Sequence, residues 1–316
     1  GREIPAGFQD HPDTAGAADA GARDLSGGVE TGTSFCSIEL VGVVSAKTRM
    51  MFMSGYFGTE YQQKLQALAE ASVEFINSTP GACQTGRMMG CDDPDRFGWD
   101  RIVSFLNRDG LFGFRMITAG KAVEVARWLT EQSCRFDTWD VFVSGQAKAL
   151  PFCEMIVAGG LADGLTELAD PTAAEGLQTR SIQTLMGAAG VVPFSGSFLV
   201  GECGPRVTVA ISDVHEKVVA AAHGYLPHNS FSAFQGHAWG GLVAVAESHR
   251  GMKLGNFINA RMVAGVFARL GASHIYELVS ASNHASRRMV EACGLRHDPS
   301  MVCGIATVGD TAKFTR

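Results

Sequence analysis

The stretch Leu242-Val-Ala-Val-Ala-Glu-Ser-His-Arg-Gly-Met-Lys-Leu-Gly-Asn256 decides the fold, because its character changes twice within a few residues. It begins as an apolar, strand-like run, passes through a turn that contains Arg250 and two glycines, and leads into a helix. The first N–H groups of a helix have no partner within the helix and carry a partial positive charge. With Arg250 and Lys253 beside them, these groups are suited to bind a pyrophosphate. The alternative is a tight turn without a ligand, since neither a Walker loop nor the three-glycine dinucleotide fingerprint is present.

A second strand–turn–helix unit follows this stretch and ends at Gly294. A hairpin precedes it, because two β-branched runs are separated by the polar turn Asp213–Lys217. The elements predicted for this half are a helix at Pro171–Ala189, strands at Val207–Ser212, Val218–Tyr225 and Trp239–Ala246, a helix at Asn256–Leu270, a strand at Ile275–Ser280 and a helix at Asn283–Cys293.

Together these units resemble the GCN5-related N-acetyltransferase (GNAT) superfamily. The first family signature, Gln/Arg-x-x-Gly-x-Gly/Ala, matches Arg250–Gly255, with Lys253 in place of the first motif glycine. The second, N-x-x-A-x-x-L-Y-x-x-x-G-F, aligns at the same spacings with Asn283–Leu295. The resemblance covers about Pro171–Phe314 and is strongest over Leu242–Leu295.

The resemblance implies a mixed central sheet flanked by helices, with acetyl-CoA as co-substrate in the cleft where two strands splay apart. It also implies that backbone groups of Val243 and Val245 pair with the pantetheine arm, and that Asn283 contacts this arm. No metal is implied. The residues that would hold the pyrophosphate are Arg250, Gly251, Met252, Lys253, Leu254 and Gly255.

The usual acid and base of the family are both missing. Gly241 stands where many members carry a glutamate base, and Val290 stands where many carry a tyrosine acid. Glu277 is the first candidate base, because it lies within the apolar strand HIYELVS. Burial raises the pKa of a carboxyl group, which suits a base that must accept a proton from an amine. The other interpretation is a paired structural glutamate.

Tyrosine and histidine side chains supply the remaining catalytic candidates. Tyr276 and Tyr225 are candidates for the missing acid, and Ser282 or Ser286 could serve instead. His223 and His237 lie at the ends of predicted strands near the expected acceptor pocket, so they are alternative bases. Each of these residues also has a purely structural interpretation, as a core aromatic or a hydrogen-bonded histidine.

Composition limits the function classes. The chain has 316 residues, with 46% hydrophobic and 18% charged residues and a mean hydropathy of +0.09, which is typical of a globular protein. Its net charge of −6 argues against a nucleic-acid partner. No apolar run is long enough to predict a membrane span. Eight cysteines without a CxxC pair indicate reduced thiols in a cytoplasmic protein and disfavour a structural zinc site.

Three regions are expected along the chain. Residues 1–34 are rich in Gly, Ala and Asp and predict a flexible tail, 35–165 an N-terminal α/β region, and 166–316 the GNAT-like domain. The stretch FGFRMIT followed by GKAVEVARWL, at 112–129, resembles the opening strand and helix of the GNAT fold. The N-terminal region is therefore either a degenerate second copy of that fold, or a part that covers the acceptor side or forms a homodimer. The elements expected in it are strands at 37–45, 111–118 and 140–144, helices at 59–77 and 121–132, and a loop at 92–100.

The sequence thus favours an enzyme that moves an acetyl or larger acyl group from acetyl-CoA to a small amine by direct attack. The alternative is a non-catalytic module that binds acyl-CoA for regulation, favoured by the missing base and tyrosine. A third possibility is an acetyltransferase that modifies proteins.

Overall fold

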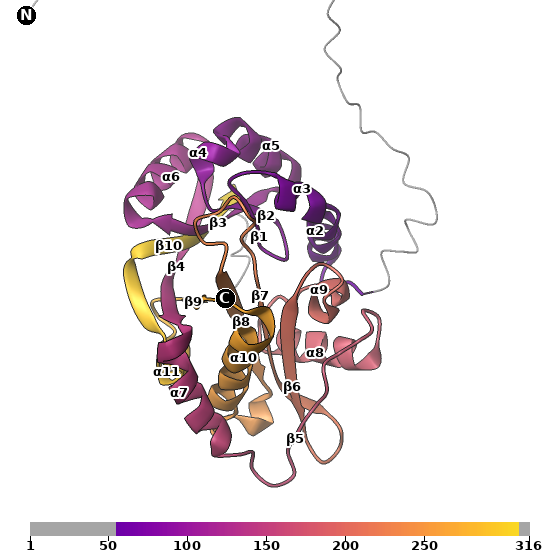
Figure 1. Cartoon of the computed structure of the whole chain (residues 1–316). Helices are drawn as coiled ribbons and strands as arrows, with labels where there is room; N and C mark the ends of the chain where they lie inside the picture. Colours follow the sequence, from indigo (N-terminus) through magenta and orange to yellow (C-terminus); the bar gives the residue numbers. More distant parts are fainter. Residues whose placement is uncertain (1–54, 310–316) are drawn as a thin grey trace, which may run out of the picture. The chain divides into compact units, whose positions relative to one another are not determined.

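The computed structural model describes residues 55–309, which build a ten-stranded sheet with helices on both faces (Figure 1). The strands are, in spatial order, β1 (Ala82–Gln84), β2 (Met89–Cys91), β3 (Leu111–Thr118), β10 (Arg296–Val308), β4 (Cys134–Gly145), β9 (His274–Val279), β8 (His237–Val245), β7 (Val218–Tyr225), β6 (Arg206–Ser212) and β5 (Thr166–Glu167). The helices are α2 (Glu60–Ala71), α3 (Val73–Ser78), α4 (Pro94–Phe97), α5 (Trp99–Asp109), α6 (Ala119–Glu131), α7 (Gln146–Ala158), α8 (Leu177–Ala188), α9 (Gly196–Val200), the short η1 (Glu247–His249), α10 (Leu254–Leu270) and α11 (His284–Ala292). This architecture confirms the predicted mixed α/β class. The expected tail at 1–34 and the strand at 37–45 lie outside the described residues.

The predicted elements of the C-terminal half are present, with one error. The helix predicted from Pro171 begins only at Leu177. The carbonyl of Ala173 accepts hydrogen bonds from the Gly176 N–H at 3.0 Å and from the Thr179 hydroxyl at 2.7 Å. These bonds close a local turn, which replaces the first turns of the predicted helix.

The N-terminal half differs more from its prediction. β3 and α6 lie where they were expected, but the helix predicted over 59–77 is divided at Ser72 into α2 and α3. The stretch 92–100 was expected to be a loop, yet it contains α4 and the start of α5. Asp93 explains this difference, because its side chain accepts a hydrogen bond from the Arg96 N–H and caps α4, with Pro94 at the first helical position.

The two halves repeat one topology. The order β2-α5-β3-α6-β4 corresponds to β8-α10-β9-α11-β10, and in each unit the first two strands are parallel. The N-terminal half is therefore a partial second copy of the fold, one of the alternatives left open by the sequence. The stretch at 112–129 forms β3 and α6, so it corresponds to β9 and α11 and not to the opening strand and helix of the fold.

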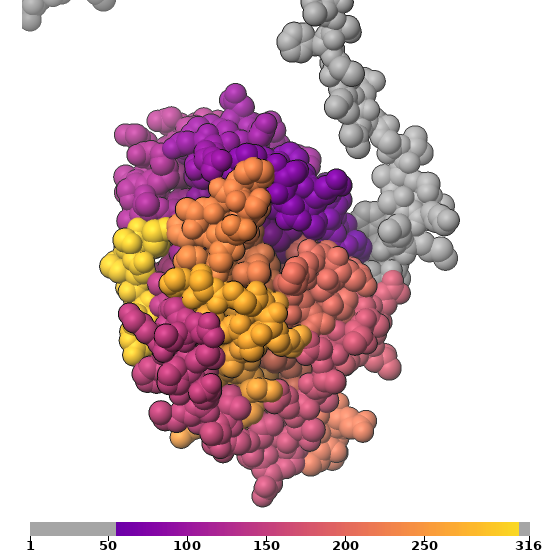
Figure 2. Space-filling model, viewed as in Figure 1, coloured from indigo at the N-terminus to yellow at the C-terminus, as the bar shows by residue number. Residues whose placement is uncertain are grey.

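The last strand of each copy pairs with the other copy. β4 lies antiparallel to β9, whereas β10 lies antiparallel to β3, and β4 and β10 pair with each other at the centre of the sheet. Each copy thus completes the sheet of its neighbour. The loop between β7 and β8 adds a further link, because the Asn229 side chain donates to the carbonyls of Ile76, Thr79 and Ala82. Figure 2 shows this orange segment lying against the indigo and violet N-terminal half.

Two apolar layers define the faces of the sheet. α10 and α11 pack on β9 through Val263 and Val290, and α5 and α6 pack on β3 through Ile102 and Leu129. The opposite face is covered by α2, α8 and α9. The described cysteines are all free thiols. Among the helices between residues 55 and 309, none has the length and apolar character needed to cross a bilayer.

Candidate active site

An opening between β8 and β9 is the central feature of the C-terminal half. The two strands pair in parallel from His237 opposite His274 to Gly240 opposite Glu277, and no pairing continues beyond that point. Leu242 adopts a left-handed backbone conformation with φ of 52°, and the pairing of β8 with β7 shifts register at this place. This irregularity bends β8 away from β9, so the strands splay apart.

The splay exposes backbone groups of β8 toward the opening. The N–H of Ala246 donates to the carbonyl of Val219 on the β7 side, at 2.8 Å. Because successive N–H groups of a strand point to opposite sides, those of Val243 and Val245 point toward β9. The parallel partner is missing there, so these groups can pair with an extended ligand.

The turn after β8 leads directly into the N-terminus of α10. Gly251 and Lys253 have φ angles of 83° and 58°, so the turn has two left-handed positions. The first bond of this 17-residue helix runs from the Phe257 N–H to the Lys253 carbonyl. The preceding N–H groups, including that of Gly255, are thus not used inside the helix. The Arg250 side chain is 60% exposed beside them and can add positive charge.

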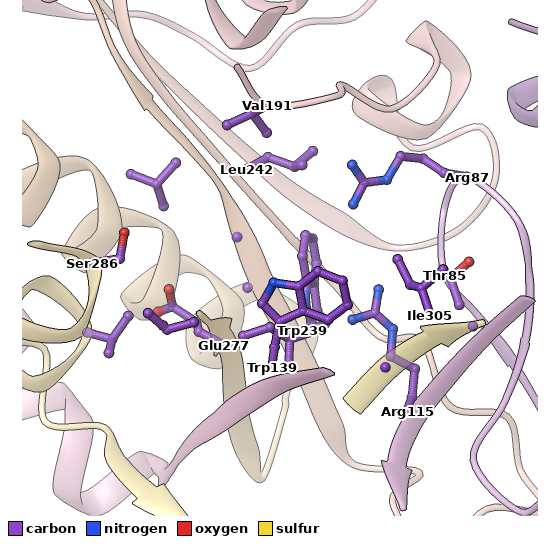
Figure 3. Close-up of a pocket in the computed structure, with 18 of the residues that line it drawn as sticks. Thr85, Arg87, Arg115, Trp139, Val191, Trp239, Leu242, Glu277, Ser286 and Ile305 are labelled. Carbon is purple, nitrogen blue, oxygen red and sulfur yellow. The ribbon is translucent and has the colours of Figure 1, made fainter. Parts of the chain in front are cut away.

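Two adjoining cavities run from this turn into the protein. The outer cavity, of about 670 Å³, lies between the turn, β8 and the start of α11. The inner cavity, of about 200 Å³, extends past Glu277 to the N-terminal half (Figure 3). Val243, Ser286 and Met289 line both cavities, so the two cavities adjoin and share a wall.

The structure brings most of the predicted co-substrate residues together at the outer cavity. The residues that line it are Val243, Val245, Arg250, Gly251, Lys253, Leu254, Gly255 and Asn283. Met252 does not line it, and its side chain is exposed beside a hollow near α7. Asn283 also caps α11, because its Oδ1 accepts a hydrogen bond from the Ser286 N–H at 3.0 Å. Its place at the cavity is therefore fixed by the helix that it begins.

Glu277, the first candidate base, lines the inner cavity. Its side chain is only 3% exposed, and one carboxylate oxygen accepts a hydrogen bond from Asn259 Nδ2 at 2.9 Å. Burial raises the pKa of Glu277 to about 7, although the Asn259 bond acts in the opposite direction. Glu277 can therefore exchange a proton near neutral pH.

Ser286, a candidate acid, lines both cavities, whereas four other candidates line neither: Tyr276, Tyr225, His223 and His237. Tyr276 faces the opposite side of the sheet, where its hydroxyl lies 3.2 Å from His228 Nε2, and burial raises its pKa. His223 bonds through Nδ1 to the Thr208 hydroxyl at 2.8 Å, and burial lowers its pKa to about 3. His237 lies at the first residue of β8 and stacks on His274 of β9. Burial, together with the charge of His274, lowers the pKa of His237 to about 4.

Residues of the N-terminal half form the far wall of the inner cavity, and the sequence did not point to them. Arg87 comes from the turn between β1 and β2, Arg115 from β3, and Trp139 from β4. Arg115 is a charged residue within the apolar strand LFGFRMIT, just as Glu277 is within HIYELVS, so the same criterion could have identified it as a candidate site residue. Within residues 55–309, no three metal-ligating side chains gather in one place.

Comparison with known proteins identifies the class. Residues 192–295 match the model of the Acetyltransferase (GNAT) family, so the C-terminal half of the chain contains a GNAT domain. The resemblance carried by the two motifs is thereby confirmed. This domain is the acetyltransferase fold, which in general serves acyl transfer from acetyl-CoA. A search of curated proteins found no match.

Solved structures extend the likeness beyond the matched domain. The GCN5-related N-acetyltransferase from Kribbella flavida has a TM-score of 0.50 at 13% identity, over 79% of this chain and 97% of that chain. The fold of that protein therefore takes in part of the N-terminal half as well. A GCN5-related N-acetyltransferase from Sphaerobacter thermophilus gives a TM-score of 0.45 at 16% identity, over 71% of this chain and 75% of that one. A tandem GNAT protein from the clavulanic acid biosynthesis pathway gives 0.45 at 9% identity, over 77% and 89% of the two chains.

Proposed function

We propose that this protein is an N-acetyltransferase that moves an acetyl group from acetyl-CoA to a small amine by direct attack. The observation that carries the proposal is the pair of adjoining cavities between the N-terminus of α10 and the buried carboxylate of Glu277. The outer cavity begins at a turn that suits a pyrophosphate and runs along the unpaired edge of β8. The inner cavity holds a group able to take a proton.

The co-substrate would lie along the outer cavity. The N–H groups at the start of α10 and the side chains of Arg250 and Lys253 would hold its pyrophosphate. The N–H groups of Val243 and Val245 would pair with the amide groups of the pantetheine arm, as an added strand would. This pairing would bring the thioester to the place where the two cavities meet.

The proton balance assigns roles to residues of the inner cavity. The amine nitrogen attacks the thioester carbonyl carbon, the carbon–sulfur bond breaks, and Glu277 accepts the proton that the nitrogen loses. The thiolate then needs a proton. The Ser286 hydroxyl, which lines both cavities, is the candidate to relay a proton from water to the thiolate, in place of the tyrosine replaced by Val290: it gives its proton to the sulfur as it takes one from the water.

The test is a titration calorimetry measurement of CoA binding, combined with an assay of CoA release from acetyl-CoA in the presence of amines. The proposal expects CoA to bind, and one or more amines to be acetylated with release of one CoA per product. A protein that does not bind CoA would contradict it.

The alternative of a non-catalytic acyl-CoA-binding module is supported by one observation, the apolar Val290 at the inner cavity where many members have a tyrosine. That alternative expects tight CoA binding without acetylation of any amine. The same pair of measurements therefore distinguishes the two functions.

A further inference from the structure

The inner cavity ends at two arginines that have no part in the proposed proton transfer. Arg87 and Arg115 are each only 7% exposed. Figure 3 shows their guanidinium groups directed into the cavity, on the side opposite Glu277 and Ser286. Both arginines belong to the N-terminal copy of the fold, whereas Glu277 and Ser286 belong to the C-terminal copy.

Arg115 carries a buried positive charge that no ion pair among the described residues neutralises. Its guanidinium lies 5.4 Å from the ring centre of Trp239, beside the hydroxyls of Tyr225 and Tyr276 and the thiol of Cys303. Burial raises the pKa of all three of these groups, so they are neutral at physiological pH. Among the described residues, no carboxylate lies within ion-pair distance of Arg115. A buried cation costs free energy unless an anion accompanies it.

Arg87 adds a second cation to the same wall. It donates through Nη1 to the Val192 carbonyl at 2.7 Å, and its guanidinium lies 5.3 Å from the ring centre of Phe194. Burial and the neighbouring charge of Arg115 lower the pKa of Arg87 to about 10. The two like charges therefore repel each other, and an anion bound at both would relieve this repulsion.

The same cavity also contains an unused hydrogen-bond donor. Trp239 lines it, and within residues 55–309 its buried indole N–H has no hydrogen-bond partner. A buried N–H without an acceptor is costly, and a ligand oxygen would satisfy it. This second observation, independent of the arginine charges, indicates a ligand with acceptor oxygens.

We propose that the acceptor amine carries an oxyanion, a carboxylate or a phosphate, which binds to Arg115 and Arg87. Guanidinium groups bind the planar oxygen pairs of both anions with two parallel hydrogen bonds. The amine of the same molecule then lies toward Glu277, at the end where the thioester arrives. This inference rests on the proposed function, because it names the substrate class of that site.

The test compares acceptors that differ only in the anion, with the full chain and acetyl-CoA. The carboxylate arm sets α-amino acids against their amides, and the phosphate arm sets O-phosphoethanolamine against ethanolamine. We expect kcat/KM to be at least tenfold higher for the anionic member in one arm, and the arm that responds identifies the anion. In Arg115→Met and, separately, Arg87→Met, this preference should fall below threefold.

Arg180→Met is the matched control. Arg180 makes the same kinds of contact as Arg87, donating to the Tyr56 carbonyl at 2.9 Å with its guanidinium 5.6 Å from the ring centre of Phe57. It lies outside the inner cavity, so this variant should keep the full preference. A loss of preference in all three variants alike would overturn the inference, because it would reflect net charge or packing alone.

A binding measurement covers the case in which no amine in the panel reacts. CoA-loaded protein is titrated with the N-acetylated acids and with O-phosphoethanolamine, with Arg115→Lys as a further variant if Arg115→Met does not fold. Weakened binding in the arginine variants supports the inference. If CoA binds but no anionic member binds or reacts, the inference is overturned while the proposed function stands. If CoA itself does not bind, the proposed function is what fails.

Discussion

Glu277 combines a cost to stability with the role of base that we propose for it. A carboxyl group this deeply buried prefers its neutral form, and the bond from Asn259 offsets only part of that preference. A pKa of about 7 leaves the carboxylate form accessible at neutral pH while keeping it basic enough to accept a proton. The raised pKa of Glu277 leads to two separate predictions, one for the rate of the reaction and one for the stability of the protein.

Glu277→Gln should lower kcat by about 10²–10⁴ without weakening CoA binding, because it removes the base and keeps the shape of the side chain. In the native protein, kcat/KM should rise with pH through about 7 as Glu277 loses its proton. Asn259→Leu serves as a comparison, because loss of its hydrogen bond should raise the pKa of Glu277 further and move this midpoint to higher pH. Steady-state kinetics between pH 5 and 9 check both effects. A glutamine variant with full kcat would show that Glu277 is structural.

Glu277→Gln should also make the folded protein more stable at pH 8. The pKa of Glu277 is about 7 in the folded protein against an ordinary 4.5, so its contribution to stability falls as pH rises through this window. The difference corresponds to at most about 3 kcal/mol. Urea unfolding at pH 8 and at pH 5 measures it, with a gain expected at pH 8 and little change at pH 5. An equal gain at both pH values would contradict the raised pKa.

At the level of single residues, an ionisable side chain within an apolar strand was the feature of the sequence that could predict a site residue. Glu277 could be predicted because a carboxylate in HIYELVS is costly unless it is paired or used. Arg115 in LFGFRMIT satisfied the same criterion but could not be connected to the site, since no spacing rule relates β3 to a cavity at β8 and β9. Tertiary packing places His223 and His237 away from the cavities, and their positions in the sequence do not predict this packing.

At the scale of elements, Gly255 in the first turn of α10 has room for a methyl group but lines the outer cavity. A Cβ at Gly255 would lie 3.5 Å from Met289 Sδ and 4.0 Å from Val245 Cγ2, which are ordinary contacts. Gly255→Ala should therefore fold normally and lose little affinity. Gly255→Val places two further methyl groups near the outer cavity, so it should weaken acetyl-CoA binding tenfold or more, roughly 1.4 kcal/mol. Calorimetry on both variants checks this gradation, and unchanged affinity in a folded valine variant would refute the phosphate-binding turn.

Elements with strong local signals were predictable, and the others were not. The hairpin of β6 and β7, and the strand and helix on each side of the turn, have clear apolar periods and boundaries. β1 and β2 have only three residues each, too few to show a period. α7 has Pro151 in its interior, and β10 includes Asp298 and Pro299, which are unfavourable in a strand.

At the scale of the whole molecule, the exchange of β4 and β10 makes each half depend on the other. β9 pairs with β4 along its length, from His274 opposite Gly145 to Val279 opposite Asp140. Without β4, the edge of β9 would be unpaired and its apolar surface uncovered. Residues 166–316 alone should therefore show no cooperative thermal transition, and co-expression with residues 55–165 should restore one.

Circular dichroism during heating measures this dependence. Truncation of residues 1–30 is the control, because the low apolar content of that segment predicts no effect on melting temperature or turnover. A fragment 166–316 that melts cooperatively at the temperature of the full chain would contradict the structural role of β4.

The strand exchange also limits how acceptor preference can be re-engineered. The arginines proposed to bind the acceptor and the turn proposed to bind the co-substrate lie in different copies. Chimaeras would therefore join the N-terminal half of one relative to the C-terminal half of another. Such a junction would separate β3 from its native partner β10, and β9 from its native partner β4. To keep both pairs, a chimaera would have to move β10 together with the N-terminal half and leave β4 with the C-terminal half, so the unit of transfer is discontinuous in the sequence.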